Sequence, residues 1–294
     1  MKDVPQRRTF NLIVEIGQSH GGDVERAKKA LREIAHVQAQ NPEINIYAKF
    51  QLFSPIDVFG ETYALAEGAT PPEINSSLSA DQYIYLIKYA QSRGVYAFAS
   101  VFDEDAVAVL YKSHQTTWAN DLWTRFPFYK ENVCRPLVKI ASRSKSDVRL
   151  FGAFAELERK LKCRPFFVIS CGNVENGSCA MPDWEPLRVV GYSPEKDAVF
   201  LYCIPKYPHV YSEADLAIIE KLVGAGDFAG ISDHACHNDD SALFAALHGK
   251  ATWYERHYTD NRETTEIDAE CSLEIQDLLR VVARISDWLE REPA

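Results

Sequence analysis

Short apolar segments alternate with segments of helical periodicity from one end of the chain to the other. The apolar segments have the length and composition of buried strands. Eight strands are predicted, at residues 10–15, 44–50, 95–100, 137–141, 165–170, 198–203, 228–232 and 251–256. Regular alternation of strands with helices implies a parallel sheet, because a helix returns the chain to the same end of the sheet each time.

Helices are predicted where apolar residues recur every three or four positions. They cover residues 23–39, 79–93, 104–112, 147–161, 213–223, 240–248 and 273–290. Asp23 and Ser79 are typical N-cap residues, and Gly94 is a typical helix stop. Residues 182–191 should hold the fifth helix but are expected to be irregular. Eight strand–helix units favour a closed (β/α)₈ TIM barrel, an α/β fold, formed as a single catalytic domain by residues 1–294.

Two segments are long for barrel loops, residues 52–78 and 114–136. Long segments in compact domains often have a functional role. Both are rich in apolar and aromatic residues, so we expect one of them to fold over the barrel mouth and to form part of a pocket. The alternative is packing on the outer helices or on a second subunit. The candidate lid aromatics are Phe53, Phe59, Tyr63, Trp118, Trp123 and Phe126.

Charge and composition exclude several classes of protein. Lys and Arg total 32 and Asp and Glu total 42, giving a net charge of −10. This argues against a nucleic-acid partner, whose phosphates bind basic surfaces, but it permits a small anionic substrate in a locally positive pocket. No apolar run approaches the ~18 residues of a membrane span, so no membrane partner is expected. The seven cysteines form no CxxC pair, and the N-terminus lacks an apolar signal region. A cytoplasmic protein with reduced thiols is expected.

Polar and charged residues gather where the predicted strands end. In TIM barrels the active site lies at these C-terminal ends. So many Lys, Glu and His residues at matched strand ends are hard to explain by structural needs alone, and we predict an active site. The residues concerned are Glu15, Lys49, Lys139, Ser142, Ser170, Tyr207, Ser232, His234, Glu255 and His257.

His234 and His257 are the best candidates for metal ligands. They follow adjacent strands, so their imidazoles can converge on one ion and leave positions open for substrate. Mn²⁺, Mg²⁺ and Zn²⁺ are all compatible, and carbohydrate oxygens favour Mn²⁺ or a similar ion. The alternative is a pair of hydrogen-bonded histidines beside acidic neighbours.

Lys49 and Lys139 would bring positive charge to a phosphate or carboxylate. The alternative, lysines on solvated strand ends, fits poorly with their apolar strands, because an unpaired buried charge is costly. Three serines could donate hydrogen bonds to the same anion, although serine also commonly caps helices. They are Ser142, Ser170 and Ser232.

Glu15 ends an apolar strand, where a carboxylate can act as a general base or hold sugar hydroxyls. A structural ion pair with a neighbouring lysine is the alternative. Asp268 lies in the loop before the last helix and is a further candidate, or an ordinary loop acid near the start of the helix.

Eight segments occur in the order found in the N-acetylneuraminate (sialic acid) synthase family, and the chain resembles that family over almost its whole length. They are VEIGQSHGGD, YAKFQLFSPIDVF, ASVFD, VKIAS, ISCGN, LYCIPKYP, GISDHACHND and ERHYTDNRETTEIDAECSL. The resemblance implies a transferase that condenses phosphoenolpyruvate with an aldehyde-form sugar, usually N-acetylmannosamine, and releases phosphate. It implies Mn²⁺ or Mg²⁺ as the cofactor, a role in carbohydrate biosynthesis, and a homodimer.

Matching of the family's motifs assigns roles residue by residue. It implies that His234 and His257 are the metal ligands. The positions that match phosphoenolpyruvate contacts are Lys49, Lys139, Ser142, Ser170 and Ser232. The positions that match residues around the sugar and the reacting centre are Glu15, Tyr207, Glu255 and Asp268.

The chain also departs from the family's pattern. Pro205 stands where an Asn usually contacts the pyruvyl group, so that contact is lost or supplied by Lys206 or another residue. Ser144 replaces a usual Glu, and Ser19 replaces a usual Asn. The chain ends after the eighth helix, and we expect it to lack the family's antifreeze-like C-terminal domain, which covers the partner's site.

Two other functions fit parts of this pattern. One is a metal-dependent sugar isomerase or aldolase on the same barrel. The other is a non-catalytic barrel that binds a sugar acid, which Pro205 and Ser144 would favour. Phosphate release from phosphoenolpyruvate in the presence of an aldose separates the synthase from both.

Overall fold

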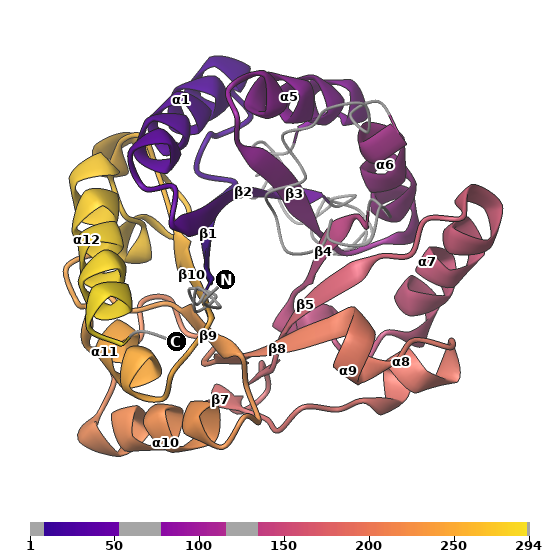
Figure 1. The fold of residues 1–294 in the computed structure, drawn as a ribbon. Helices are drawn as coiled ribbons and strands as arrows, with labels where there is room; N and C mark the ends of the chain where they lie inside the picture. The colour runs from indigo at the N-terminus through magenta and orange to yellow at the C-terminus, as the bar shows by residue number, and fades with distance from the viewer. Residues whose placement is uncertain (1–8, 53–77, 116–134, 293–294) are drawn as a thin grey trace, which may run out of the picture.

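The computed structural model describes residues 9–52, 78–115 and 135–292. These residues form a closed barrel of parallel strands inside a ring of helices, in the order β1-β10-β9-β8-β5-β4-β3-β2 (Figure 1). The barrel strands are β1 (Phe10–Gly17), β2 (Ile44–Leu52), β3 (Tyr96–Val101), β4 (Leu137–Ile140), β5 (Phe166–Ser170), β8 (Ala198–Cys203), β9 (Gly230–Asp233) and β10 (Trp253–His257). The predicted TIM barrel is confirmed.

The last two strands begin two residues later than the sequence predicted. Phe228 and Ala251 are buried, but ladder pairing between β9 and β10 begins at Gly230 and Trp253. The two strands approach so closely there that a Cβ on Gly230 would lie 1.7 Å from the carbonyl oxygen of Trp253. An apolar pattern detects burial, and burial starts before pairing does.

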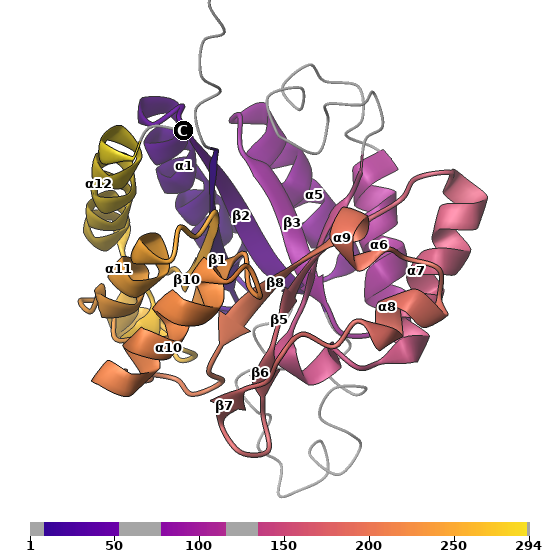
Figure 2. The same ribbon diagram turned by 60° about the horizontal axis from the view of Figure 1, so that its bottom comes forward.

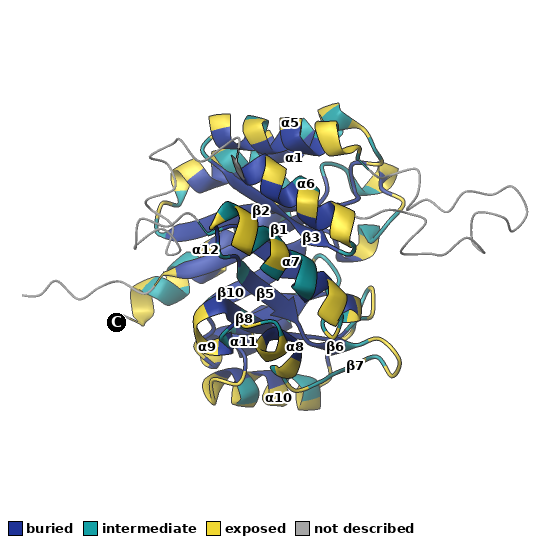
Figure 3. Cartoon of the chain, turned by 90° about the vertical axis from the view of Figure 1, so that its right-hand side faces the viewer, coloured by how far each residue is buried: buried dark blue, intermediate teal, exposed yellow. Residues whose placement is uncertain are grey.

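The helices cover the outside of the barrel. They are α1 (Val24–Gln40), α5 (Ala80–Ser92), α6 (Glu104–Gln115), α7 (Val148–Leu161), α8 (Glu185–Val189), α9 (Pro194–Asp197), α10 (Glu213–Gly224), α11 (Ser241–His248) and α12 (Ile275–Arg291). Figure 3 shows their buried faces turned to the strands and their exposed faces turned outward. None of the described helices is long and apolar enough to cross a membrane.

The predicted helix starts have the expected capping contacts. Asp23 accepts a hydrogen bond from the backbone N–H of Glu25 at 2.7 Å. Ser79 and Gln82 form a reciprocal capping box at the start of α5. Each contact satisfies an N–H group that the first helical turn leaves without a partner. The fifth helix is irregular, as expected: the short helices α8 and α9 stand in its place.

A two-stranded hairpin, β6 (Gly172–Asn173) and β7 (Ser178–Cys179), follows β5 and was not predicted. Strands of two residues are too short to produce a period-2 pattern. Figure 2 shows the hairpin projecting beyond the ends of the barrel strands.

Two hydrophobic clusters hold the fold together. The larger lies between the strands and the surrounding helices. The smaller fills the inside of the barrel, where Tyr47 stacks on Trp253 with ring centroids 5.8 Å apart. This inner cluster consists of Ile13, Tyr47, Tyr96, Phe98, Leu137, Val168, Leu201 and Trp253. It closes the barrel interior beneath the polar residues described next.

Most of the two long segments, residues 53–77 and 116–134, lies outside the described residues. All of the candidate lid aromatics fall in these ranges, so the expectation of a lid stays a prediction.

Candidate active site

A polar layer lies directly above the inner cluster, and strand alternation places it there. Side chains two positions apart on a strand point to the same face. Two residues beyond Ile13 comes Glu15, and two beyond Tyr47 comes Lys49. The same step leads from Phe98 to Ser100, from Leu137 to Lys139, from Val168 to Ser170, from Leu201 to Cys203 and from Trp253 to Glu255. The inner cluster and the polar layer are therefore formed by successive inward-facing residues of the same strands.

The polar layer opens into a cavity of about 270 Å³. Every residue that the sequence singled out as a site residue lines it. They are Glu15, Lys49, Lys139, Ser142, Ser170, Tyr207, Ser232, His234, Glu255, His257 and Asp268. The structure thus brings together residues that are up to 253 positions apart, from Glu15 to Asp268. Their chemical roles are a separate question.

Two lysines and two glutamates form a buried network on one side of the cavity. The Lys49 ammonium contacts the Glu15 carboxylate and lies 3.5 Å from Glu255 Oε1. Lys139 Nζ lies 3.2 Å from Glu255 Oε2. All four side chains are at least nine-tenths buried. Buried charges of this kind persist only when they are paired, because removal from water costs several kcal/mol per ion.

Each lysine also donates a hydrogen bond to a serine on the neighbouring strand. Lys49 Nζ donates to Ser100 Oγ and Lys139 Nζ donates to Ser170 Oγ, both at 2.7 Å. Burial would raise the pKa of Glu255, but Lys139 and then Lys49 outweigh it and hold that pKa below its usual value. The carboxylate therefore stays ionised, whereas burial lowers the pKa of Lys49 to about 7, although the charge of Glu255 opposes this effect.

His234 and His257 lie side by side, with ring centroids 5.4 Å apart. His234 Nδ1 lies 2.8 Å from the carbonyl oxygen of Ile204, which can only accept, so Nδ1 carries a proton. Burial lowers the pKa of this ring, but Cys203 and the Ile204 carbonyl outweigh burial and raise that pKa above its usual value. Tyr207 packs against His234 at a centroid distance of 4.0 Å. Burial, followed by the charge of His234, holds the pKa of His257 well below its usual value, so this ring is neutral.

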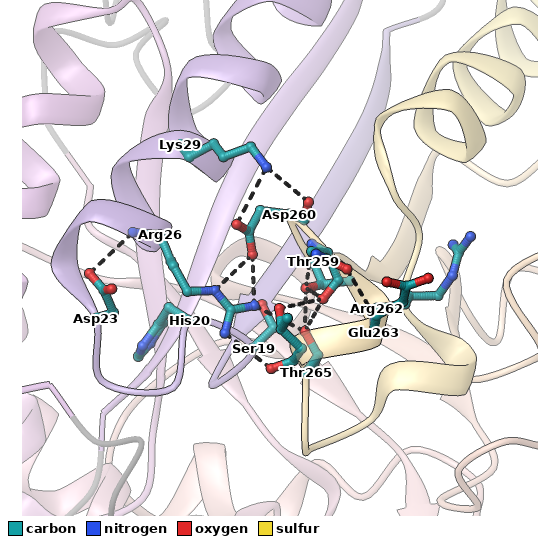
Figure 4. Close-up of polar contacts among 12 residues, drawn as sticks. Ser19, His20, Asp23, Arg26, Lys29, Thr259, Asp260, Arg262, Glu263 and Thr265 are labelled. Carbon is teal, nitrogen blue, oxygen red and sulfur yellow. Dashed lines mark hydrogen bonds and ion pairs between the residues drawn. The ribbon is translucent and has the colours of Figure 1, made fainter.

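Asp268 reaches the cavity from the loop after β10. Its Oδ2 lies 3.4 Å from His257 Nδ1. The loop is fixed to α1 by an ion pair in which Arg26 Nε and Nη2 both donate to Asp260 Oδ1, at 3.0 and 2.8 Å (Figure 4). On its other side Arg262 Nη1 binds Asp277 of α12 at 2.5 Å. These anchors hold the backbone that presents Asp268.

The two histidines could bind a metal ion that takes only a few of its ligands from the protein. Imidazole nitrogen is a donor type that divalent transition ions accept, and both rings line the cavity. Within the described ranges, no group of three or more His, Cys, Asp or Glu side chains is arranged to hold an ion. The remaining positions of a metal at His234 and His257 would fall to substrate oxygens or water.

The departures from the family's pattern are distributed differently around the cavity. Pro205 lines it and offers no donor, while Ser144 is buried and does not line it. Lys206 does not line this cavity, so it does not take over the missing Asn contact; its side chain lines a second cavity. Ser19 donates to the carbonyl oxygen of Tyr258 at 2.8 Å and so connects the loops after β1 and β10.

Several residues that line the cavity were assigned no role from the sequence: Gln18, Gln51, Ser100, Phe102, Arg143 and Cys203. Gln51 and Ser100 are among the polar residues at the predicted strand ends, and Cys203 follows from alternation along β8. Arg143 carried no usable signal. Its guanidinium lies over the Phe102 ring at 5.5 Å, and this contact joins the segments that follow the paired strands β3 and β4.

Gly17 ends β1 at a β-bulge next to the site. Its φ is +54°, a conformation that favours glycine. A Cβ at this position would lie 2.8 Å from Glu15 Oε1. The glycine therefore makes room for the carboxylate and allows the chain to turn away above it.

Comparison with known proteins places the chain in a sequence family. A model described as the NeuB family matches residues 128–291. N-acetylneuraminate-9-phosphate synthase of Mus musculus is 26% identical over 286 residues, covering 93% of this chain and 68% of the mouse protein. An uncharacterized protein of Methanocaldococcus jannaschii is 23% identical over 275 residues, covering 93% of this chain and 69% of that protein.

Solved structures share the fold. The N-acetylneuraminic acid (sialic acid) synthetase of Leptospira borgpetersenii, in complex with citrate, has a TM-score of 0.70 at 22% identity, covering 97% of this chain and 88% of that chain. A spore coat polysaccharide biosynthesis protein of Bacillus subtilis has a TM-score of 0.67 at 19% identity, covering 98% and 70%. At these identities the likeness concerns the fold.

Proposed function

The chain belongs to the NeuB family, whose model matches more than half of its residues, and we propose that it is a phosphoenolpyruvate-dependent sugar-acid synthase. The proposed reaction joins phosphoenolpyruvate to an aldehyde-form sugar, releases phosphate and makes a nonulosonic or related sugar acid. Mn²⁺ or Mg²⁺ is the proposed cofactor.

The observation that carries the proposal is the buried lysine network. Lys49 and Lys139 lie in one cavity with two histidines, where their amino groups contact Glu15 and Glu255. Phosphoenolpyruvate brings a phosphate and a carboxylate, each of which can take up contacts that the glutamates now make. Binding of neutral sugar hydroxyls alone does not require two buried lysine side chains.

The proposed anion contacts extend around the cavity. Ser170 already accepts a hydrogen bond from Lys139, so its hydroxyl proton is available for a substrate oxygen. Ser142 and Ser232 line the same cavity on neighbouring elements. Three hydroxyls and two ammonium groups would then hold phosphoenolpyruvate in one orientation.

His234 and His257 would hold the ion, and Asp268 would orient His257. When bound, Mn²⁺ or Mg²⁺ supplies Lewis-acid polarisation of the sugar's aldehyde group. The chain's own residues then need to hold the two reactants in contact and to keep water away from every carbon except C2 of phosphoenolpyruvate.

In the proposed reaction C3 of phosphoenolpyruvate forms a bond with the aldehyde carbon, and the aldehyde oxygen takes up a proton to become a hydroxyl. Water adds at C2, and the C2–O bond to phosphate breaks, leaving a keto group. We assign Glu15 as the base that accepts the proton of the attacking water, because its carboxylate faces Lys49 in the polar layer. Tyr207 and Glu255 are assigned to the sugar hydroxyls and to the reacting centre.

A phosphate-release assay tests this function. The purified protein is incubated with phosphoenolpyruvate, Mn²⁺ and a panel of aldoses that includes N-acetylmannosamine. Phosphate release that requires both substrates and the ion is expected. Lys139→Gln should strongly reduce it at low phosphoenolpyruvate concentration, while the matched control Lys221→Gln, on the exposed face of α10, should leave it unchanged. An isomerase or aldolase would convert sugars without phosphoenolpyruvate. A binding protein would bind both compounds and release no phosphate, and either result contradicts the proposal.

A further inference from the structure

A second cavity, of about 390 Å³, lies outside the barrel between the β6–β7 hairpin and α10. Its floor is apolar and includes Ile204, Leu222 and Phe228. Met181 and Ile218 form an exposed apolar rim. A volume of this size is in the range of small-molecule sites, which are usually apolar with a few polar groups.

One extended segment separates this cavity from the active-site cavity. Cys203, Pro205 and Tyr207 line the active-site cavity. Tyr202, Ile204 and Lys206, at the intervening positions, line the second cavity. Successive side chains of an extended chain point to opposite faces, so the same backbone is the wall of both cavities.

The segment is also bound to the histidine pair. His209 lines the second cavity, and its backbone N–H donates to the carbonyl oxygen of His234 at 2.8 Å. Tyr207 packs on the His234 ring at 4.0 Å. A molecule that displaces this segment would therefore move groups that contact the active-site cavity.

The polar groups of the second cavity favour an anion. Lys206 forms no ion pair with any carboxylate among the described residues. The nearby Asp215 already accepts hydrogen bonds from Ser212 N and Oγ, at 2.9 and 2.8 Å, in the capping box of α10. Asp215 lines the same cavity, and its Oδ2 lies 3.8 Å from His209 Nε2, which is buried and makes no hydrogen bond among the described residues. Lys206 is therefore the group that offers an anion a charge with unused hydrogen-bonding capacity.

We propose that the second cavity is a regulatory site for a small amphipathic anion. The apolar body lies on Ile204, Leu222 and Phe228, and a carboxylate or phosphate binds Lys206. Occupancy changes the affinity of the active-site cavity for phosphoenolpyruvate through the shared segment that carries Tyr207. Binding of the anion is inferred from this cavity alone, while its effect on the affinity for phosphoenolpyruvate rests on the proposed function.

Methionine NMR gives a direct test, because the chain has two methionines, Met1 and Met181. Protein labelled with ¹³C at the methionine methyl groups is titrated with 4-phenylbutyrate, phenyl phosphate and the neutral analogue 4-phenylbutanol. A saturable shift of the Met181 signal is expected for the anions, with Met1 as the internal reference. The stronger of the two anions identifies the preferred head group.

Variants identify the binding site. Lys206→Gln should weaken anion binding about 10-fold or more, because a charge-assisted contact is lost. The control Lys221→Gln, on α10 but outside the cavity, should leave it unchanged. Ile218→Trp should fill the cavity from its exposed rim and abolish the titration. Equal affinity in Lys206→Gln and the parent protein, or an unshifted Met181 signal, overturns the proposal.

The effect on the active site is measured by titrating phosphoenolpyruvate with and without saturating probe. The probe is expected to change the affinity for phosphoenolpyruvate by about threefold or more. When the probe is titrated with and without saturating phosphoenolpyruvate, its affinity should change by the same factor. An unchanged affinity for phosphoenolpyruvate overturns the regulatory role, and simple competition overturns the separate site. If phosphoenolpyruvate does not bind at all, the proposed function fails, and the Met181 titration still decides whether the second site exists.

Discussion

Arg256 and Asp233 form a buried ion pair directly behind the two histidines, with 2.8 Å between Arg256 Nη1 and Asp233 Oδ2. Asp233 is the last residue of β9 and directly precedes His234, and Arg256 precedes His257 on β10. Because alternate residues face opposite sides of a strand, the ion pair lies on the outer face of the barrel and the histidines on the inner face. The pair therefore fixes the two strand ends that present the imidazoles.

The ion pair also organises the loop after β9. Arg256 Nη2 donates to the carbonyl oxygens of Ala235 and Cys236, at 3.1 and 3.0 Å. The Tyr254 hydroxyl donates to Asp233 Oδ2 at 2.5 Å. With this many charge-assisted hydrogen bonds, one arginine connects β9, β10 and the loop that leads to α11.

Replacement of Arg256 by methionine should destabilise the protein strongly. Asp233 would remain as a buried carboxylate without its cation, and removal of one partner of a buried pair costs about 3–5 kcal/mol. Urea unfolding measures the loss. The double variant Asp233→Asn with Arg256→Met removes the uncompensated charge and should recover part of the stability. A loss below about 1 kcal/mol in the single variant would show that the pair does not hold these strands.

His234→Ala and His257→Ala should each lower affinity for Mn²⁺ and abolish turnover while the fold survives. Both rings line a cavity and lie at strand ends, so removal of either takes away a ligand and leaves the hydrophobic clusters intact. Isothermal titration with Mn²⁺ and circular dichroism separate loss of binding from loss of fold. His248→Ala, on the exposed end of α11, is the matched control. Persistence of metal binding and activity in both variants would refute the metal assignment.

Lys49→Ala and Lys139→Ala should raise the apparent KM for phosphoenolpyruvate far more than that for the sugar. A lost charge-assisted contact costs about 1.5–3 kcal/mol, which corresponds to roughly 10- to 150-fold. Steady-state kinetics with each substrate varied in turn gives the comparison. Equal effects on both KM values would argue that the lysines hold neither the phosphate nor the carboxylate.

The Lys49 variant needs a control, because it also leaves Glu15 buried without its cation. Glu15→Gln combined with Lys49→Met removes both charges and should restore stability without restoring affinity for phosphoenolpyruvate. Recovery of that affinity in the double variant would mean that the effect of Lys49→Ala came from the stranded carboxylate.

The barrel and the position of its site were predictable because both follow from local patterns. The step from Tyr47 to Lys49 shows one face of β2 changing from apolar to charged, and parallel strands deliver such changes to one end of the barrel. Burial patterns did not fix where pairing begins, as the late starts of β9 and β10 show. The roles of the individual site residues were predicted from the family's motifs, and they remain proposals.

Contacts between loops were not predictable, since no sequence period encodes them. Arg26 reaches Asp260 only after β1 has paired with β10 and closed the barrel, and Arg143 reaches Phe102 only after β3 has paired with β4. The second cavity was missed for a related reason. Lys206 was considered as a substitute for the Asn that Pro205 replaces, but alternation along residues 202–207 turns it to the opposite side of the segment.

Acid should destabilise the protein through His20, which is buried in the loop after β1. His20 Nδ1 accepts a hydrogen bond from the backbone N–H of Gly22 at 2.9 Å, so the ring is neutral. Burial lowers the pKa of His20 from 6.5 to about 4, and the charge of Arg26 adds to this effect. A backbone contact of Gly17 and, to a smaller extent, the charge of Asp23 oppose it.

Because the folded pKa lies below the unfolded one, the unfolded chain binds more protons between pH 6.5 and 4. The stability contributed by neutral His20 is present above pH 6.5 and is lost as the pH falls toward 4. The loss attributable to this residue between pH 7 and pH 5 is about 2 kcal/mol. Urea unfolding across this range should show a smaller decrease in His20→Gln, whose amide can still accept from Gly22 but does not titrate. An identical decrease in both proteins would assign the acid sensitivity to other groups.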